Sequence, residues 1–305
     1  MFDIRYKFIS KELDNETSYT YFEARYYDSE LSGWLSVDPM SDKYPSLSPY
    51  CYSADNPVVL KDPNGMLITD YYDIKTGEHL EHIDDGIDEA IAINSIVYNA
   101  LKSDGNLTNQ NAKDLGGISL GGNTDFEMIA ATLYAEASIK NSAEECAAIY
   151  DVIENRSNVS GKSINEIIKS TGIYGYGSKN YNIALSEGKG YNANEYSTSR
   201  HNAARKGAMM GILNPNNKLD YSQGAYYWQG SDFANHTKGS HAYERFYKVG
   251  FKFTNTNHDI WNLGDIKSGN TNWDYKYQST GAVGKTTFMK LTNEWIKANN
   301  YRGDW

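Results

Sequence analysis

The sequence is poor in the features that tie small extracellular proteins together or anchor a protein in a membrane. Its two cysteines in 305 residues, Cys51 and Cys146, exclude a disulfide framework and a four-thiolate zinc site, and we expect both to be buried thiols. No run of 18 apolar residues occurs, so we expect no membrane-spanning helix. Residues 1–5 do not begin the basic and apolar pattern of a secretory signal.

The chain also lacks a block of basic residues. Its net charge of -10 is unevenly distributed: residues 124–305 carry 20 Lys and Arg against 18 Asp and Glu, whereas residues 1–66 and 67–123 are both acidic. Basic patches supply most of the affinity of proteins for nucleic acid. We therefore expect no nucleic-acid partner for this chain, which is long enough for about two domains.

The first 66 residues are aromatic and rich in turns. Residues 19–22 and 24–27 have the tyrosine and threonine content of short strands, and Asp-Ser, Ser-Gly, Asp-Pro and Asn-Pro pairs separate the strands. Several elements in this order resemble the C-terminal end of an Rhs/YD-repeat core. They are Tyr6-Lys7-Phe8, Lys11-Glu12-Leu13-Asp14, Ala24-Arg25-Tyr26-Tyr27-Asp28, Gly33-Trp34-Leu35-Ser36-Val37-Asp38-Pro39, Pro49-Tyr50, Asn56-Pro57 and Asp62-Pro63-Asn64-Gly65.

This resemblance implies that residues 1–66 are the end of a large β shell that delivers a C-terminal toxin domain. In related proteins, two aspartates of Asp-Pro motifs cleave the chain just after the second motif. Asp38 and Asp62 match these positions, which implies autoproteolysis near Met66. The alternative is that both aspartates only cap Asp-Pro turns.

Residues 67–123 have the pattern of an acidic helical spacer. Apolar residues recur with helical spacing over residues 85–102, at Ile87, Ala90, Ile91, Val97, Ala100 and Leu101. Residues 103–123 are rich in Gly and Asn, which predicts a linker. We therefore expect a domain boundary between residues 123 and 124.

Residues 124–305 carry the signals of an α+β, mainly helical domain with a small β region. Three helix starts have the capping-box spacing, at Thr124 with Glu127, Ser142 with Glu145, and Ser163 with Glu166. The sequence also predicts a long binding loop over residues 172–199, helices over 200–212 and 287–298, and strands over 224–228 and 246–253.

The first of these helices places an acidic residue beside its buried stripe. At 100° per residue, Glu136 lies next to Leu133 and Ala137. Partial burial raises the pKa of a carboxyl group, and a carboxyl that stays protonated near neutral pH can donate a proton to a glycosidic oxygen. The alternative is an ordinary Glu at the helix boundary with its carboxylate in water.

Residues 125–230 resemble the bacterial cell-wall hydrolase family that includes spore-cortex lytic enzymes. The matching segments, in the order of the family, are residues 131–137, 147–156, 167–168, 172–174, 203–204, 211 and 224–228. The resemblance implies a lysozyme-like fold that cleaves peptidoglycan glycan strands. It implies that Glu136 is the single catalytic acid and base of a lytic transglycosylase or muramidase. No second carboxylate is evident from the sequence, because Asp151 and Glu154 lie on the next helix.

Aromatic and polar side chains near these motifs are candidates for sugar contacts. The candidate substrate-binding residues are Tyr134, Asn155, Arg156, Tyr174, Tyr176, Tyr227 and Trp228. Aromatic faces stack on sugar rings, and Asn and Arg hold N-acetyl or carboxyl groups. The alternatives are core packing for the aromatic residues and satisfaction of helix carbonyls for Arg156.

The two resemblances together imply an antibacterial effector. It would act in the envelope of a target cell, reach the periplasm through secretion machinery and be neutralised by a cognate immunity protein. We expect neither a metal nor a cofactor. Two alternatives remain open: a nuclease toxin that uses His236 and His241, and a non-catalytic module that binds the cell wall.

Overall fold

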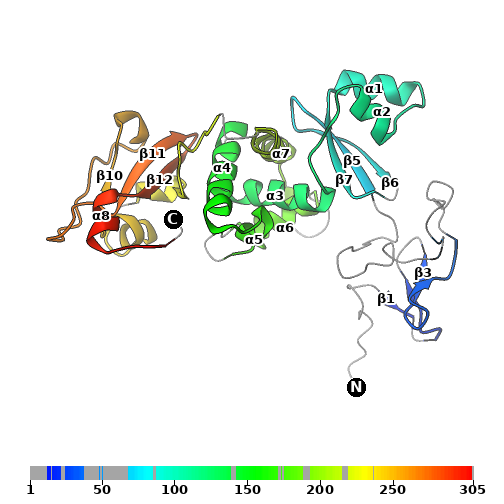
Figure 1. Cartoon of the computed structure of the whole chain (residues 1–305), viewed down its shortest axis with the longest axis horizontal. Coiled ribbons are helices and arrows are strands. Elements are labelled where there is room, and N and C mark those ends of the chain that lie inside the picture. Colours follow the sequence, from blue (N-terminus) through cyan, green and yellow to red (C-terminus); the bar gives the residue numbers. More distant parts are fainter. Residues whose placement is uncertain are drawn as a thin grey trace.

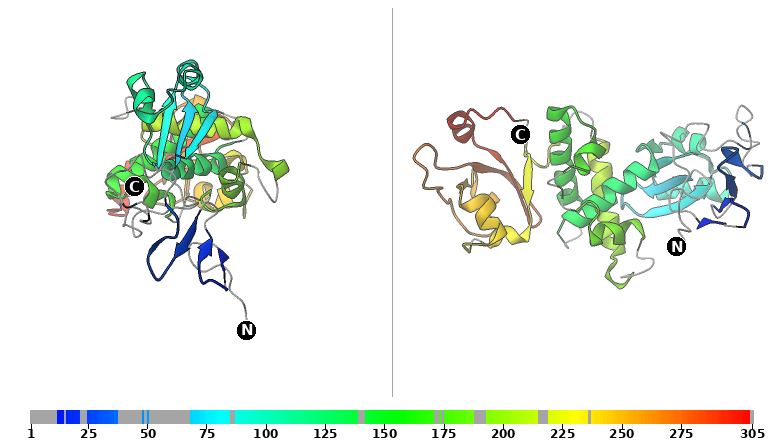
Figure 2. Two further views of the ribbon diagram at one scale, coloured as in Figure 1. Left: turned by 90° about the vertical axis from the view of Figure 1, so that its right-hand side faces the viewer. Right: turned by 90° about the horizontal axis from the view of Figure 1, so that it is seen from below.

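The computed structural model shows a mixed α+β protein. It describes residues 12–14, 16–21, 25–37, 48, 50, 68–84, 87–138, 142–170, 173, 175–187, 193–214, 219–235 and 237–303. Figures 1 and 2 show a sheet of residues 68–119, a central group of helices and a C-terminal sheet in a row. None of the described helices is long and apolar enough to span a membrane.

Short antiparallel strands form the described N-terminal part, as the aromatic pattern predicts. The strands are β1 (Glu12–Leu13), β2 (Thr20–Tyr21), β3 (Tyr26–Asp28) and β4 (Gly33–Trp34), paired in chain order. Tyr27 and Trp34 are buried edge to face, with ring centroids 5.7 Å apart. Cys51, Asp38, Asp62 and Met66 lie outside the described residues, so cleavage near Met66 stays a prediction.

Residues 68–119 form a second sheet with two helices packed against it. The elements are β5 (Ile68–Asp73), β6 (His79–Asp84), β7 (Glu89–Ile93), β8 (Ile118–Ser119), α1 (Ser95–Ser103) and α2 (Asn109–Asp114). The strand order is β6-β5-β7-β8, with β5 and β7 parallel. The linker expected over residues 103–123 therefore contains α2 and β8.

The helix expected over residues 85–102 is wrong in its first half, which is strand β7. Ala90 and Ala92 face the core of the central helices, whereas Ile91 and Ile93 face α1 and α2. A strand that is buried on both faces has a continuous apolar run, and such a run also fits a helical stripe. The domain boundary expected between residues 123 and 124 lies at the start of the next helix. This helix and the sheet pack in the same hydrophobic core.

The central part is helical and contains the largest core. Its elements are α3 (Asn123–Glu136), α4 (Ala143–Ser160), α5 (Ile164–Ile168), α6 (Lys179–Leu185), η3 (Ala193–Glu195) and α7 (Thr198–Ile212). Helix α7 is as expected, whereas α6 and η3 occupy the stretch expected to be an irregular loop. Gly207 and Gly211 let α7 approach Cys146 and Tyr150 of α4 so closely that a Cβ atom would overlap them. Cys146 is buried, as expected.

Two of the three expected helix caps are present. Ser142 accepts from the Glu145 amide, and Ser163 forms a complete capping box with Glu166. The cap expected at Thr124 is wrong, because α3 already begins at Asn123. The Thr124 amide instead donates to Asp88 Oδ1 of the preceding loop at 3.1 Å.

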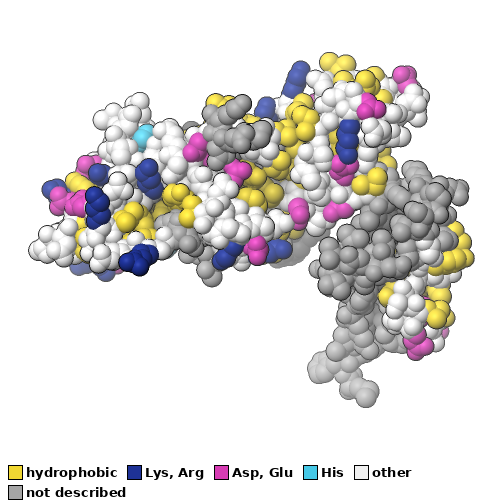
Figure 3. All heavy atoms as spheres, in the orientation of Figure 1, with side chains coloured by type: hydrophobic (Ala, Val, Ile, Leu, Met, Phe, Trp, Pro, Cys, Tyr) yellow, Lys and Arg dark blue, Asp and Glu magenta, His cyan; other side chains and the backbone are white. Residues whose placement is uncertain are grey.

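The C-terminal part is a four-stranded sheet with short helical turns. Its elements are β9 (Tyr227–Gln229), η4 (Ser231–Ala234), the π-helix η5 (Tyr243–Tyr247), β10 (Phe251–Lys252), η6 (Thr256–His258), β11 (Tyr277–Val283), β12 (Thr286–Leu291) and α8 (Asn293–Ala298). The strand order is β10-β11-β12-β9. On the face seen in Figure 3, several Lys and Arg side chains lie over this part.

Two expectations for this part are wrong. The strand expected over residues 246–253 is the end of η5 followed by β10, because Gly250 has a φ of +82° and interrupts the extended backbone. The helix expected over residues 287–298 is strand β12 followed by α8. The threonine-rich start of β12 pairs with β11 from Thr286 onward, which is typical of β-branched residues.

Candidate active site

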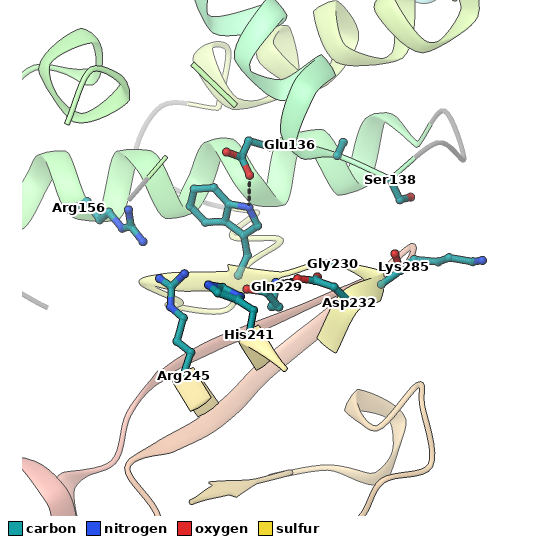
Figure 4. A pocket seen from close by; sticks show the side chains of 12 residues that line it. Glu136, Ser138, Arg156, Gln229, Gly230, Asp232, His241, Arg245 and Lys285 are labelled. Carbon is teal, nitrogen blue, oxygen red and sulfur yellow. Dashed lines mark hydrogen bonds between the residues drawn. The ribbon is translucent and has the colours of Figure 1, made fainter. Parts of the chain in front are cut away.

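Glu136 is the last residue of α3 and extends into a pocket. The helix ends there because Ala137 adopts an extended conformation, with φ -72° and ψ 157°. Glu136 is half-buried, as its place beside the apolar stripe predicts. Its Oε2 accepts from Trp228 Nε1 at 3.2 Å (Figure 4). Its Oε1 accepts from the Gly175 amide. These two donors come from different parts of the chain and fix the orientation of the carboxyl group.

The approach of the Gly175 loop to this carboxyl group requires a glycine. A Cβ atom on residue 175 would lie 2.7 Å from Glu136 Cγ, so any larger residue there would displace the Glu136 side chain from this position. The lack of a side chain at Gly175 thus lets the backbone N–H of this Gly-rich loop reach the Glu136 carboxyl group.

The pocket has a volume of about 660 Å³ and lies between the central helices and the C-terminal sheet. It is lined by Glu136, Ala137, Ser138, Arg156, Trp228, Gln229, Gly230, Ser231, Asp232, His241, Arg245 and Lys285. One wall thus comes from α3 and α4, and the other comes from β9, η4, the η5 region and the turn between β11 and β12.

A buried glutamate, Glu145, joins the two walls at one end of the pocket. Its carboxylate accepts from the Ser138 amide at 3.1 Å and from the Ser138 hydroxyl at 2.6 Å. It also accepts from the hydroxyl of Thr286 at 2.5 Å. The capping-box spacing therefore predicts only half of its role: Ser142 caps the helix, but the Glu145 side chain ties the end of α3 to strand β12.

Asn155 and Arg156 join the walls at the other end. Asn155 Nδ2 donates to Ala225 O at 3.0 Å, and Arg156 Nε donates to Tyr226 O at 2.8 Å. Both bonds hold the segment before β9 against α4. Arg156 also lines the pocket, and burial lowers its pKa to about 10. The structure thus places Asn155 in the scaffold of the site and Arg156 both in the scaffold and in the pocket wall.

The aromatic candidates lie in different places. Trp228 lines the pocket and donates to Glu136. Tyr227 packs in the C-terminal core, with its ring 5.4 Å from that of Tyr277. Tyr134 is buried, and its hydroxyl accepts from the Ser197 amide at 3.1 Å. Tyr176 is 37% exposed and contacts Tyr181 outside the pocket lining, and Tyr174 lies outside the described residues.

The structure adds pocket residues that the sequence does not predict. Asp232 is a second carboxylate in the pocket, where its Oδ2 accepts from Gln229. Arg245 and Lys285 add positive charge. These residues come from irregular segments without a periodic pattern, so only the pairing of β9 with β12 brings them to Glu136. Asp151 and Glu154 are not among the pocket residues.

The structure describes one of the two histidines of the nuclease alternative. His241 lines the pocket, whereas His236 lies outside the described residues. Within the described ranges, no group of three His, Cys, Asp or Glu side chains is arranged to hold a metal ion.

A second pocket of about 410 Å³ lies where the central helices meet the sheet of β5 and β6. Glu127 of α3 lines it, and its Oε1 accepts from Arg205 Nε at 2.8 Å and from the Tyr72 hydroxyl at 2.7 Å. His201 Nε2 lies 3.4 Å from its Oε2. Burial raises the pKa of Glu127, but His201 and Arg205 more than offset this effect and hold the pKa well below its usual range. Both oxygens of Glu127 therefore have cationic or polar neighbours from within the protein.

Comparisons with known proteins add little to this geometry. No family model and no solved structure matches the chain. Salivary gland surface protein 1 of Aedes aegypti is similar, with 34% identity over 64 residues. These residues span 21% of this chain and 2% of that protein. The function must therefore be argued from the site itself.

Proposed function

We propose that the Glu136 pocket cleaves the glycan strands of peptidoglycan. The observation that carries the proposal is the placement of Glu136: a half-buried carboxyl group, held by two N–H donors, in a pocket of about 660 Å³. Glycosidic bond cleavage needs such an acid beside a cleft. The resemblance of residues 125–230 to cell-wall hydrolases assigns the same role to the same residue.

In the proposed reaction, Glu136 protonates the oxygen that bridges N-acetylmuramic acid and N-acetylglucosamine. The C–O bond breaks, and positive charge develops on the muramic ring. In transglycosylation, the C6 hydroxyl of that ring attacks its C1 atom and returns a proton to Glu136, which leaves a 1,6-anhydro product. In hydrolysis, a water molecule attacks instead, and Asp232 is the residue of this pocket that would accept its proton.

The other resemblance, of residues 1–66 to the end of an Rhs core, supports a biological setting for this reaction. In that setting the chain is the tip of an antibacterial effector that acts in the periplasm of a target cell. A cognate immunity protein then protects the producer by covering the pocket, and secretion machinery delivers the chain.

The test is mass spectrometry of purified peptidoglycan after digestion with the wild type and with Glu136→Gln. Anhydro-muropeptides from the wild type indicate transglycosylation, and reducing ends indicate hydrolysis. Glu136→Gln should release neither, whereas Glu78→Gln, an exposed Glu outside both pockets, should match the wild type. If the wild type binds peptidoglycan but releases no fragments, the domain is a wall-binding module and the proposal is wrong.

A further inference from the structure

Positive charge is concentrated on the C-terminal wall of the Glu136 pocket. Residues 219–303 contain ten Lys and Arg against seven Asp and Glu, and Arg245 and Lys285 from this part line the pocket. Among the residues that the structure describes, neither cation has an acidic side chain within ion-pair distance. The two pocket carboxylates are held by other donors, Glu136 by Gly175 and Trp228 and Asp232 by Gln229.

Arg245 shares one end of the pocket with Arg156. Figure 4 shows the two guanidinium groups at that end, with His241 beside Arg245, whereas Ser138 and Lys285 lie at the opposite end. Both arginines line the same pocket, and Arg156 also feels the charge of the Glu136 carboxyl group, which partly offsets that of its guanidinium. Two guanidinium groups at one end of a partly enclosed pocket repel each other, and an anion bound between them is attracted to both.

The geometry of this end favours a carboxylate as the anion. A guanidinium group is planar and offers parallel N–H donors that match the two oxygens of a carboxylate. Trp228 lies beside this end, with the Arg156 guanidinium carbon 5.1 Å from its ring centroid. An aromatic face next to a carboxylate site suits a sugar ring that carries an acidic substituent.

We propose that Arg245 and Arg156 form a subsite for the carboxylate of an acidic sugar, so that the pocket selects anionic glycans over neutral ones. The inference rests on the proposed function and adds to it a substrate class. It also assigns a function to the C-terminal part, which lies mostly outside the region of cell-wall hydrolase resemblance and supplies Arg245 from η5.

The test compares two forms of one substrate. Peptide-free peptidoglycan strands carry a lactyl carboxylate on every second sugar, and amidation of these groups gives a neutral strand of the same length. We expect the wild type to cleave the acidic strand with a kcat/KM about tenfold higher than that for the amidated strand. Arg245→Met should remove this preference by slowing cleavage of the acidic strand alone.

The controls separate charge from folding. Met keeps an unbranched apolar side chain at position 245 but removes the guanidinium group, whose carbon lies 5.2 Å from the Phe246 ring centroid. Lys248→Met removes an exposed cation one residue after η5 and should leave the preference unchanged. Thermal melting checks that both variants are folded.

A binding measurement distinguishes failure of the subsite from failure of the proposed function. Glu136→Gln should bind the acidic strand more tightly than the amidated one in calorimetry, whether or not the wild type cleaves either. Equal binding of the two strands, or equal loss of both activities in Arg245→Met, would overturn the subsite. If charge-selective binding occurs without cleavage by the wild type, the subsite stands and the proposed reaction does not.

Discussion

Helix α3 carries two glutamates, Glu127 and Glu136, in opposite kinds of surroundings. Glu127 accepts from Arg205 and Tyr72 and lies near His201, so the protein neutralises its charge. Glu136 accepts from the indole N–H of Trp228 and the amide N–H of Gly175 and extends into the larger pocket, where its charge acts on Arg156. Burial alone therefore does not distinguish the two carboxyl groups. Glu127 is tied by a direct guanidinium bond into the structure between helix and sheet, whereas Glu136 is oriented at a pocket surface, where a proton donor to a ligand has to be.

The largest expected effect is a loss of activity on substitution of Glu136, which we do not expect for Glu127. Glu136→Gln should lower the rate of peptidoglycan cleavage by about 10³-fold, because general acid catalysis contributes factors of this size. The melting temperature should stay within about 1 °C of the wild type, since Gln retains an acceptor for one of the two donors. Release of soluble muropeptides and a thermal melt measure the two quantities. A large loss of stability would place Glu136 in the same class as Glu127.

The reverse result is expected for Glu127→Gln. This change leaves Arg205, which is 3% exposed, with Glu187 as its acidic partner, and should lower the free energy of unfolding by about 3 kcal/mol at pH 7. Because the folded-state pKa of Glu127 lies below its ordinary value of 4.5, the difference should persist above that pH and shrink as the pH falls. Urea denaturation at several pH values measures it.

The control for this prediction is Glu195→Gln, which breaks an exposed pair with Lys179. It should change the free energy of unfolding by less than about 1 kcal/mol. The activity of folded Glu127→Gln should equal that of the wild type, and a specific loss of turnover would show that Glu127 takes part in the chemistry.

A third carboxylate sharpens the comparison, because Asp151 of α4 is buried without a cation. The Tyr221 amide donates to its Oδ2 at 2.7 Å, while its Oδ1 has no hydrogen-bond partner in the described part of the chain. Burial raises the pKa of Asp151 to about 7, and the charge of Asp220 acts in the same direction. The folded state therefore holds a proton that the unfolded state releases from its ordinary pKa of 3.8 upward.

This pKa shift predicts that stability is lost as the pH rises from about 4 to about 7. Asp151→Asn, which cannot ionise, should raise the free energy of unfolding by about 2 kcal/mol at pH 8 and leave it unchanged at pH 4. Asp274→Asn, at an exposed ion pair with Lys267, should show no such pH dependence. A gain from Asp151→Asn that is equal at both pH values would contradict the assignment.

The smallest expected effect concerns the orientation of Glu136. Trp228→Phe removes the indole N–H that lies 3.2 Å from Oε2 but retains an aromatic face. It should lower kcat by about fivefold to tenfold, the cost of one hydrogen bond, with little change in KM. Trp295→Phe, whose ring packs against the C-terminal core and does not line the pocket, serves as the matched control. An effect on KM alone would assign Trp228 to sugar binding only.

The sequence predicts the acid of the site better than the pocket around it. Helical periodicity places Glu136 beside Leu133 and Ala137, and the resemblance of the neighbouring residues to cell-wall hydrolases singles it out as the candidate acid. Trp228 lies in a recognisable aromatic strand, but nothing local indicates that its indole reaches Glu136. Asp232 lies in η4, Arg245 in the π-helix η5 and Lys285 in the turn between β11 and β12. Trp228 is positioned by the pairing of β9 with β12. Such long-range contacts depend on the whole fold and cannot be predicted from a short stretch of sequence.

The same limit explains the errors in the fold. Strand β7 has an apolar run because both of its faces are buried, and β12 precedes a short helix without a break in composition. In both places a helical period fits the residues as well as the strand does. The α4 and α7 helices are predictable because each buries a single face over several turns.

The pairing of β9 with β12 also fixes when the site can exist. Trp228 is held in place by a strand that ends at Leu291, so a ribosome must translate nearly the whole described chain before Glu136 gains its indole partner. Nascent and prematurely terminated chains therefore lack an organised acid. Under the proposed function, a nascent chain cannot cleave glycan strands before β12 has been synthesised.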